Sequence, residues 1–223
     1  MKNVKKSDVI YWIIGMVLCA LGIALCTKAN FGLSMIAAPP YILHVWLRDM
    51  FPWYTQGMSE YVWEGIVLII TCIIVRKFKA RYLLSFVTAV ISGLLIDGWL
   101  LVLGGNGAYT SLIIRIIAFV AGFSITTFAI ACFFRTVLPL QVYELSVKEI
   151  ATDEKHPRDM IKVKRVFDIA MLGITVLMAL FLTHSWEGIG IGTVIMTVFN
   201  ATLINLFSKL LDKIESGICH DKS

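Results

Sequence analysis

The chain has 223 residues, of which 58% are hydrophobic and only 16% are charged, and its formal net charge is +5. A water-soluble domain usually carries roughly a quarter charged residues, so this composition excludes an ordinary soluble protein. Several apolar runs reach the about 20 residues that a helix needs to cross the hydrocarbon core of a bilayer. The positive charge lies mostly in short segments beside those runs, which is a pattern of membrane topology and argues against nucleic-acid binding.

The apolar runs predict six membrane-spanning helices. We expect them at about residues 9–27, 60–75, 82–103, 112–134, 164–183 and 189–210. The first run continues into a full span without an A-x-A cleavage site, so we expect no cleavable signal peptide. Residues 211–223 form a polar tail that we expect to be only partly ordered. The prediction is a single all-α integral membrane domain over residues 1–223.

Basic residues predict the orientation. The N-terminal lysines, RKFKAR at 76–81, the long segment 135–163 and the C-terminal tail fall on one side of a six-span arrangement. The loops GGNGAYT and HSWEG on the other side contain no Lys or Arg. Since Lys and Arg accumulate on the cytoplasmic side of a plasma membrane, we expect a multi-pass protein with both termini in the cytoplasm.

The two halves of the chain are similar when one is offset by about 104 residues. Repeat one covers about 9–103 and repeat two about 112–210, and the alignment places Glu64 opposite Asp168. Each repeat reads as a span, an irregular segment and two further spans. Three crossings are an odd number, so the second copy is turned upside down. Inverted repeats of this kind recur in transporters, whose solute sites lie near the midplane at the repeat interface.

The irregular segment of repeat one, GIALCTKANFGLSMIAAPPYILHVW, leaves a span and re-enters apolar sequence with a Pro-Pro pair. Irregular backbone at membrane depth is tolerated only where it is buried in protein or lines a wet cavity. We therefore expect residues 28–47 to be re-entrant, with a position at the membrane interface as the alternative. LPLQVYELSVKEIA at 138–151 is the more polar counterpart in repeat two.

Polar residues in or beside the spans are the candidate substrate-binding or coupling residues, because ionisable groups at membrane depth usually face the bundle interior or a wet cavity. The candidates are Lys28, Ser34, Tyr41, Glu64, Asp97, Arg115, Glu144, Asp168 and Asn200.

Five of these candidates receive specific roles. Ser34 is predicted to cap a half-helix whose backbone N–H groups face an anionic solute group. Lys28 and Arg115 would add positive charge. Asp97 and Asp168 would carry a coupling proton or a counter-charge. Glutamate, arginine and aspartate near span ends also reach the interface as plain pairing residues, which is the alternative role for several candidates.

No pattern in the sequence predicts an enzyme, a metal site or a cofactor. The four histidines are scattered, and the five cysteines lack metal-type spacing. No Ser/His/Asp, Cys/His, HExxH or Walker-type arrangement is visible. The EGIGIGT glycines lack the strand–helix unit of a nucleotide site, so we expect them to serve close helix packing.

KANFGLSMIAAPPYIL, RKFKARYLLSFVTAVISGLLIDG, VKRVFDIA and GIGIGTVI together resemble the YitT/YczE-like bacterial integral membrane proteins, within their uncharacterised six-span branch. The resemblance covers about residues 10–208. It implies a bacterial plasma-membrane location and a transport-like role without an assigned substrate. It also implies a distant similarity to the substrate-binding subunits of energy-coupling-factor vitamin transporters.

The favoured hypothesis is a small-solute membrane transporter, or a solute-binding membrane subunit, with its site between the inverted repeats. Its partners would be the lipid bilayer, an unidentified small solute, and an ATPase module or a second copy. An energy-coupling-factor-type subunit would dock on an ATPase module through the small-residue face of Ala20 and Ala24. The alternative from another class is a non-transporting structural or regulatory membrane protein, whose interior would be closed by apolar packing.

Overall fold

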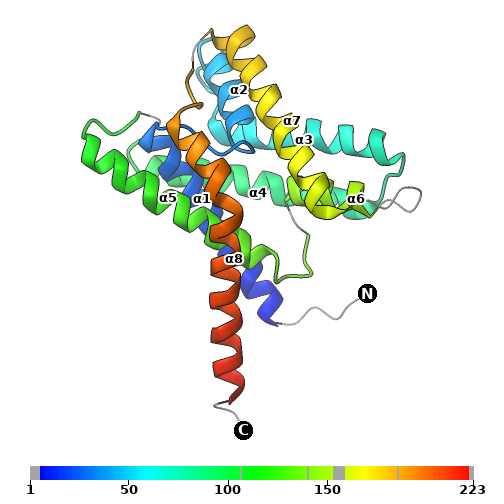
Figure 1. The fold of residues 1–223 in the computed structure, drawn as a ribbon. Helices are drawn as coiled ribbons and strands as arrows, with labels where there is room; N and C mark the ends of the chain where they lie inside the picture. Colours follow the sequence, from blue (N-terminus) through cyan, green and yellow to red (C-terminus); the bar gives the residue numbers. More distant parts are fainter. Residues whose placement is uncertain (1–5, 106, 140, 153–158, 185, 221–223) are drawn as a thin grey trace.

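The computed structural model describes residues 6–105, 107–139, 141–152, 159–184 and 186–220, which form helices and connecting loops without any strand (Figure 1). Its helices are α1 (Lys6–Ala29), α2 (Ala38–Arg48), α3 (Gln56–Val75), α4 (Ala80–Val102), α5 (Leu112–Phe133), α6 (Val142–Ala151), α7 (Met160–Met178), the π-helical turn η1 (Ala179–Thr183) and α8 (Ile191–His220). Six helices are long and apolar enough to cross a membrane. The predicted all-α membrane fold with six spans is confirmed. Part of the predicted basic segment, 153–158, lies outside the described residues.

The order of long and short helices repeats. Each half contains a long helix, a short helix and two long helices, so α1 to α4 correspond to α5 to α8. Several contacts between helices are also reciprocal, although the contact of α4 with α6 has no counterpart between α8 and α2 among the described residues. Helix α1 packs on α4 as α5 packs on α8, and each short helix contacts both α3 and α7. This pairing of contacts is the one that the predicted two-fold relation between the repeats requires.

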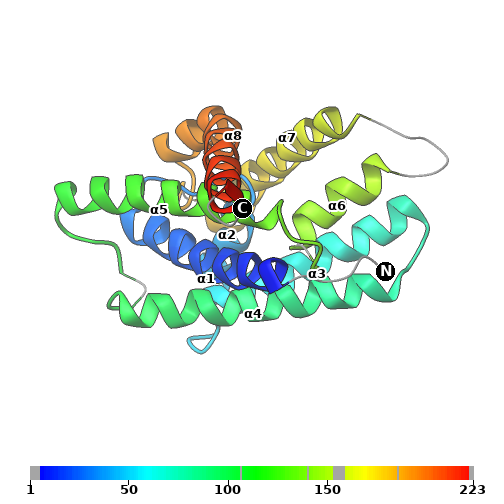
Figure 2. The same ribbon diagram turned by 90° about the horizontal axis from the view of Figure 1, so that it is seen from below.

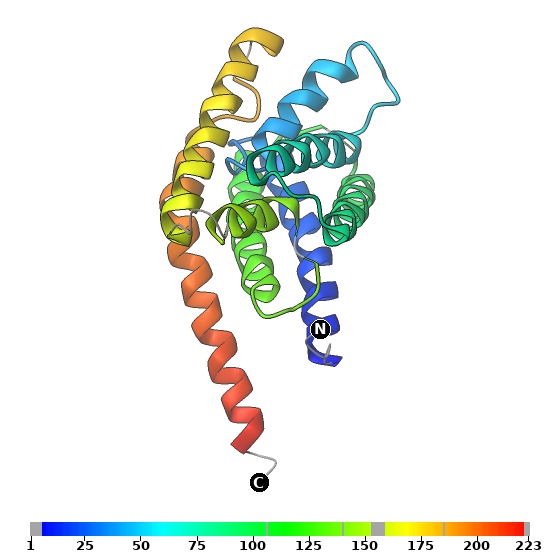
Figure 3. The ribbon, with the colours of Figure 1, turned by 90° about the vertical axis from the view of Figure 1, so that its right-hand side faces the viewer.

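The two halves differ at their last helix pair. Helix α3 packs along α4, whereas α7 and α8 have no backbone contact among the described residues. Figure 2 shows α8 nearly end-on while α4 and α5 run across the view, so α8 crosses them steeply. In Figure 3, α7 and α8 lie together on one side of the molecule, with the lower part of α8 extending beyond the other helices.

The C-terminal segment corrects one expectation. Residues 211–220, predicted to be a partly ordered tail, continue α8 as far as His220. The segment contains no proline, and its Leu, Lys, Ile and Glu residues support a helix. An ion pair between Arg135 and Asp212 also ties this part of α8 to the end of α5.

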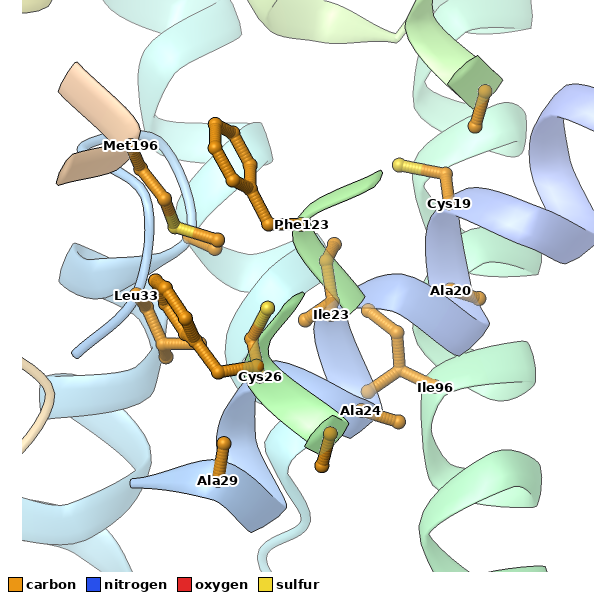
Figure 4. Packing of buried hydrophobic residues seen from close by; sticks show 14 of the residues in the cluster. Cys19, Ala20, Ile23, Ala24, Cys26, Ala29, Leu33, Ile96, Phe123 and Met196 are labelled. Atoms are coloured by element: carbon orange, nitrogen blue, oxygen red, sulfur yellow. The ribbon is translucent and has the colours of Figure 1, made fainter. Parts of the chain in front are cut away.

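The core of the bundle lies along α1, where it meets α4, α5 and α8. Figure 4 shows Ile23 of α1 among Ile96, Phe123 and Met196, all of which are buried. Ala20 and Ala24 lie in this core with 0% of their surface exposed. Their small-residue face is therefore covered by the chain's own helices, and the predicted docking of a partner through it is wrong.

Helices α1 and α5 approach each other through glycine. A Cβ on Gly22 would lie 2.1 Å from Thr126 Oγ1 and 2.8 Å from the Gly122 carbonyl oxygen. A Cβ on Gly122 would in turn lie 2.8 Å from the Gly22 carbonyl oxygen. The absence of side chains at both positions lets the two first helices of the repeats touch backbone to backbone.

We predict that Gly22→Ala destabilises the protein because the new methyl group must push α1 and α5 apart. Overpacking of this kind costs about 1–3 kcal/mol. Gly98→Ala is the matched control, since it also lies within a helix but a Cβ there meets nothing within 4 Å. It is expected to be neutral or to gain up to about 1 kcal/mol of helix propensity. Thermal unfolding of the purified variants measures both effects, and equal stability of the two variants would contradict the crossing described.

Candidate functional site

A cavity of about 40 Å³ lies between the two repeats and is called the central chamber. Its lining includes Ala37 and Gln141, the residues that immediately precede α2 and α6. The N-terminal ends of both short helices therefore meet at the chamber. Polar side chains from both halves of the chain line its wall. The polar lining residues are Ser34, Glu60, Thr126, Gln141, Tyr143, Glu144 and Asn200.

A second cavity of about 110 Å³ adjoins the chamber and is called the vestibule. The two cavities share Ser34 and Asn200 among their lining residues. The vestibule continues between α7, which contributes Lys164 and Asp168, and α8. The side chains of Lys164 and Asp168 are 36% and 22% exposed. The vestibule therefore lies between the chamber and the partly exposed Lys164–Asp168 pair.

Three glutamates gather beside the chamber. Glu60 and Glu64 follow each other by one turn of α3 and are 4% and 0% exposed. Glu144 reaches the same region from α6, and the carboxyl of Glu64 interacts electrostatically with those of Glu60 and Glu144. Among the described residues, Lys164 is the basic side chain that lies near Glu144. Its ammonium group forms an ion pair with Asp168 at 2.9 Å.

The glutamates are incompletely hydrogen-bonded. Glu64 Oε2 accepts a hydrogen bond from the backbone N–H of Val142, at 3.3 Å, while its Oε1 has no partner. Glu144 Oε2 and the hydroxyl of Tyr143 also have no hydrogen-bond partner within the described part of the chain. Like charges that share a buried site cannot all be ionised. The cluster can therefore hold protons, or a cation that supplies hydrogen-bond donors.

The repeat makes the site asymmetric. The offset of about 104 residues places Glu60 opposite Lys164 and Glu64 opposite Asp168, so two acids on α3 correspond to one ion pair on α7. Glu60 was missed as a candidate by the sequence analysis, although it lies one turn from Glu64. Its position opposite Lys164 in the repeat was the signal that could have found it.

The start of α2 leaves no free N–H group for an anion in its first turn. Ser34 closes the turn that leads into α2, because its Oγ accepts from the N–H of Ala37 at 3.3 Å and its carbonyl oxygen accepts from the N–H of Ala38 at 2.9 Å. The N-cap of α2 itself is Ala37 and not the predicted Ser34. The next two residues, Pro39 and Pro40, have no N–H. The expected capture of an anionic solute group by free N–H groups of α2 is therefore not what this geometry offers.

The bundle end that carries Lys28, called the Lys28 end, is closed by backbone contacts. The N–H of Leu33 donates to the Gly188 carbonyl at 2.9 Å, and the N–H of Gly192 donates to the Phe31 carbonyl at 2.8 Å. A Cβ on Gly190 would lie 2.4 Å from the Phe31 oxygen. The glycines of EGIGIGT thus permit close approach, as expected. Gly190 approaches the extended segment after α1, Gly188 approaches Tyr41 of α2, and Gly192 approaches Phe119 of α5.

Lys28 and Arg115 bind helix ends. Arg115 donates to the carbonyls of Ala29 at 2.7 Å and of Asn30 at 2.8 Å, where α1 has unpaired carbonyl groups. Lys28 donates to the carbonyl of Gly105, after α4, at 2.9 Å. Both side chains lie outside the lining of the chamber, so their placement fits a clasp at the Lys28 end better than the predicted contact with a solute.

Asp97 and Tyr41 also lie outside the chamber lining. Asp97 Oδ2 accepts from the Thr55 hydroxyl at 2.6 Å, and its Oδ1 accepts from the N–H of Gly57 at 2.8 Å, which caps the first turn of α3. The ring of Tyr41 packs on Gly188. Of the nine predicted site residues, the structure brings four to the chamber or vestibule and one beside them. These are Ser34, Glu144, Asp168 and Asn200, with Glu64 next to the chamber.

We predict that Asp97→Ala lowers the free energy of unfolding by about 1–2 kcal/mol, the usual loss for a helix cap. Asp97→Asn keeps an acceptor oxygen and is expected to lose less. Thermal unfolding measures the difference. A normally stable Asp97→Asn protein that no longer bound or moved solute would contradict the capping role and favour the predicted coupling role.

Comparison with known proteins places the whole six-span region in one family. The model of a family of unknown function, DUF6198, matches residues 6–209. The chain is similar to the "Uncharacterized protein YyaS" of Bacillus subtilis (strain 168), with 27% identity over 209 residues that cover 91% of this chain and 93% of the relative. No solved structure matches. These matches do not directly support the narrower YitT/YczE-like resemblance. The chain belongs to the DUF6198 family of unknown function.

Proposed function

We propose that the chain is a small-solute membrane transporter whose site is the central chamber. The observation that carries the proposal is the position of that chamber, where the two short helices of the repeats meet around buried carboxyl groups. Transporters built from inverted repeats bind solute at such an interface. Buried ionisable groups in a membrane bundle mark solute and ion paths. A purely structural bundle would be expected to fill this place with apolar side chains.

The vestibule would be the access path. It joins the chamber through Ser34 and Asn200 and leaves the bundle between α7 and α8, while the Lys28 end is closed by the contacts of Phe31 and Leu33. In an alternating-access transporter, each conformational state has its solute site open to one side of the membrane and closed to the other. The unpacked α7–α8 pair would be the element that moves when the state changes.

We infer a bacterial plasma-membrane location with both termini cytoplasmic. The support is the Lys/Arg bias of the N-terminus, residues 76–81 and residues 135–163. With that orientation the vestibule would face the cytoplasm and the Lys28 end the outside. Kinship with the YitT/YczE-like proteins remains a proposal that rests on the four motifs quoted for it.

The cavity sizes favour a very small solute. Drug-sized ligands occupy pockets of about 300–1,000 Å³, whereas the chamber and vestibule measure about 40 and about 110 Å³. A vitamin-sized solute of an energy-coupling-factor-type subunit would need a much larger site. We therefore favour a transporter of ions or small polar solutes over that alternative.

The test measures the flux of solutes into proteoliposomes. The panel contains small cations, anions and neutral solutes, and the flux is measured as radiotracer uptake and as current on a solid-supported membrane. Asn200→Phe fills the junction of chamber and vestibule. We expect flux to fall by roughly tenfold or more, as a 1–3 kcal/mol packing clash implies.

Val198→Phe is the matched control because it adds a ring on the same helix at a side chain that is 62% exposed. It should keep nearly full flux. The proposal fails if the folded protein moves no solute of the panel faster than empty vesicles do. It also fails if Asn200→Phe transports as well as Val198→Phe.

A further inference from the structure

The oxygen atoms beside the central chamber lack hydrogen-bond donors. Glu64 Oε1, Glu144 Oε2 and the Tyr143 hydroxyl are buried and find no partner among the residues that the structure describes, and Tyr143 is only 1% exposed. A buried polar group without a partner costs about 1–3 kcal/mol, and a charged one more. Tyr143 and Glu144 both line the chamber, so a ligand in the chamber is within reach of the groups that need donors.

The surrounding side chains do not supply these donors. Gln141 Nε2 donates toward Ser92 Oγ at 3.4 Å. Lys164 donates to Asp168 at 2.9 Å. Helix α1 contributes Cys19 to the wall of the chamber, which Glu60 and Glu144 also line. The site therefore has an excess of acceptors and of negative charge, which disfavours an anion and suits a cation with N–H groups.

We propose that the central chamber binds the ammonium group of a very small amine, either the free ammonium ion or the head of a short primary alkylamine. This proposal rests on the proposed function and specifies the solute class of the same site. The ammonium N–H groups donate to Glu144 and Tyr143, and its charge is balanced by Glu60 and Glu144. A cavity needs about 10–15 Å³ to hold one water molecule. The chamber of about 40 Å³ therefore accepts an ammonium group, and a short alkyl chain on that group would extend into the vestibule.

Binding exchanges the ammonium cation for a proton. Without a cation, the buried carboxyls of Glu60 and Glu64 and the carboxyl of the half-buried Glu144 beside them cannot all be ionised, so at least one of them holds a proton. The amine enters already protonated, takes the place beside the carboxylate, and the displaced proton goes to solvent. Lys164 and Asp168 face the same region but neutralise each other. Apparent affinity therefore falls with falling pH, by up to about tenfold per pH unit for one displaced proton.

The experiment measures the binding of small cations to the purified protein in detergent. Binding is detected by thermal shift and by titration calorimetry. The ligands are ammonium chloride and methylammonium chloride, with tetramethylammonium chloride and sodium chloride at equal ionic strength. Tetramethylammonium carries the charge but has no N–H group. We expect the first two salts to stabilise the protein and the last two to be inactive. A pH indicator in weak buffer should register proton release when ammonium or methylammonium is added.

Two variants report on the site itself. Tyr143→Phe removes one acceptor and keeps the ring, so affinity should fall by roughly tenfold, as the loss of one hydrogen bond to a charged group implies. Glu144→Gln should abolish both binding and proton release. Glu187→Gln is the matched control, because Glu187 pairs with Arg48 at 3.3 Å and is 45% exposed. It should bind as the natural chain does.

Each outcome decides the proposal. Equal stabilisation by sodium or tetramethylammonium overturns it, as does an absence of any ammonium effect or unchanged binding by Glu144→Gln. If the protein moves a neutral or anionic solute and binds no amine, the transporter proposal stands and the amine proposal fails. If amines bind with proton release and no solute is moved, the amine site stands and the transporter proposal fails.

Discussion

Two helices begin inside the bundle, and the need to satisfy their first backbone N–H groups governs the centre of this protein. Unpaired backbone groups in a membrane bundle are costly. Helix α2 meets the need with Ser34, which accepts from Ala37 and Ala38, and with two prolines that have no N–H. Helix α6 meets it with a carboxyl group, since Glu64 accepts from Val142. The two solutions differ in charge, and the character of the chamber follows from that difference.

The position of Glu64 at the start of α6 places two further glutamates nearby. Once Glu64 lies at the start of α6, the buried Glu60 one turn before it and the half-buried Glu144 in the first turn of α6 fall into the same region. In the other repeat the equivalent positions on α7 hold Lys164 and Asp168, which neutralise each other. A symmetric scaffold thus encloses an asymmetric site in which acidic groups outnumber basic ones.

The two repeats also differ in how closely their helices are packed. The α1–α5 crossing is held by glycine-to-glycine contact, and the Lys28 end by Arg115 and by the bonds of Phe31 and Leu33. Helices α3 and α4 are packed together, whereas α7 and α8 are separated by the vestibule. In the part of the chain that the structure describes, the second repeat thus lacks the packing of its last two long helices that holds α3 against α4.

The sequence by itself determined the number of spans, the repeat and the broken segment after α1, because apolar length and the Pro-Pro pair are local properties that the bilayer constrains strongly. It also pointed to Ser34, Glu144, Asp168 and Asn200. The tertiary structure alone decided that Asp97 caps α3, that Lys28 and Arg115 hold helix ends, and that Glu60 joins the acidic cluster. Whether a polar side chain caps a helix or lines a cavity depends on which atoms of distant segments lie within hydrogen-bond reach. That proximity is set by helix packing, and no periodicity along the chain contains it.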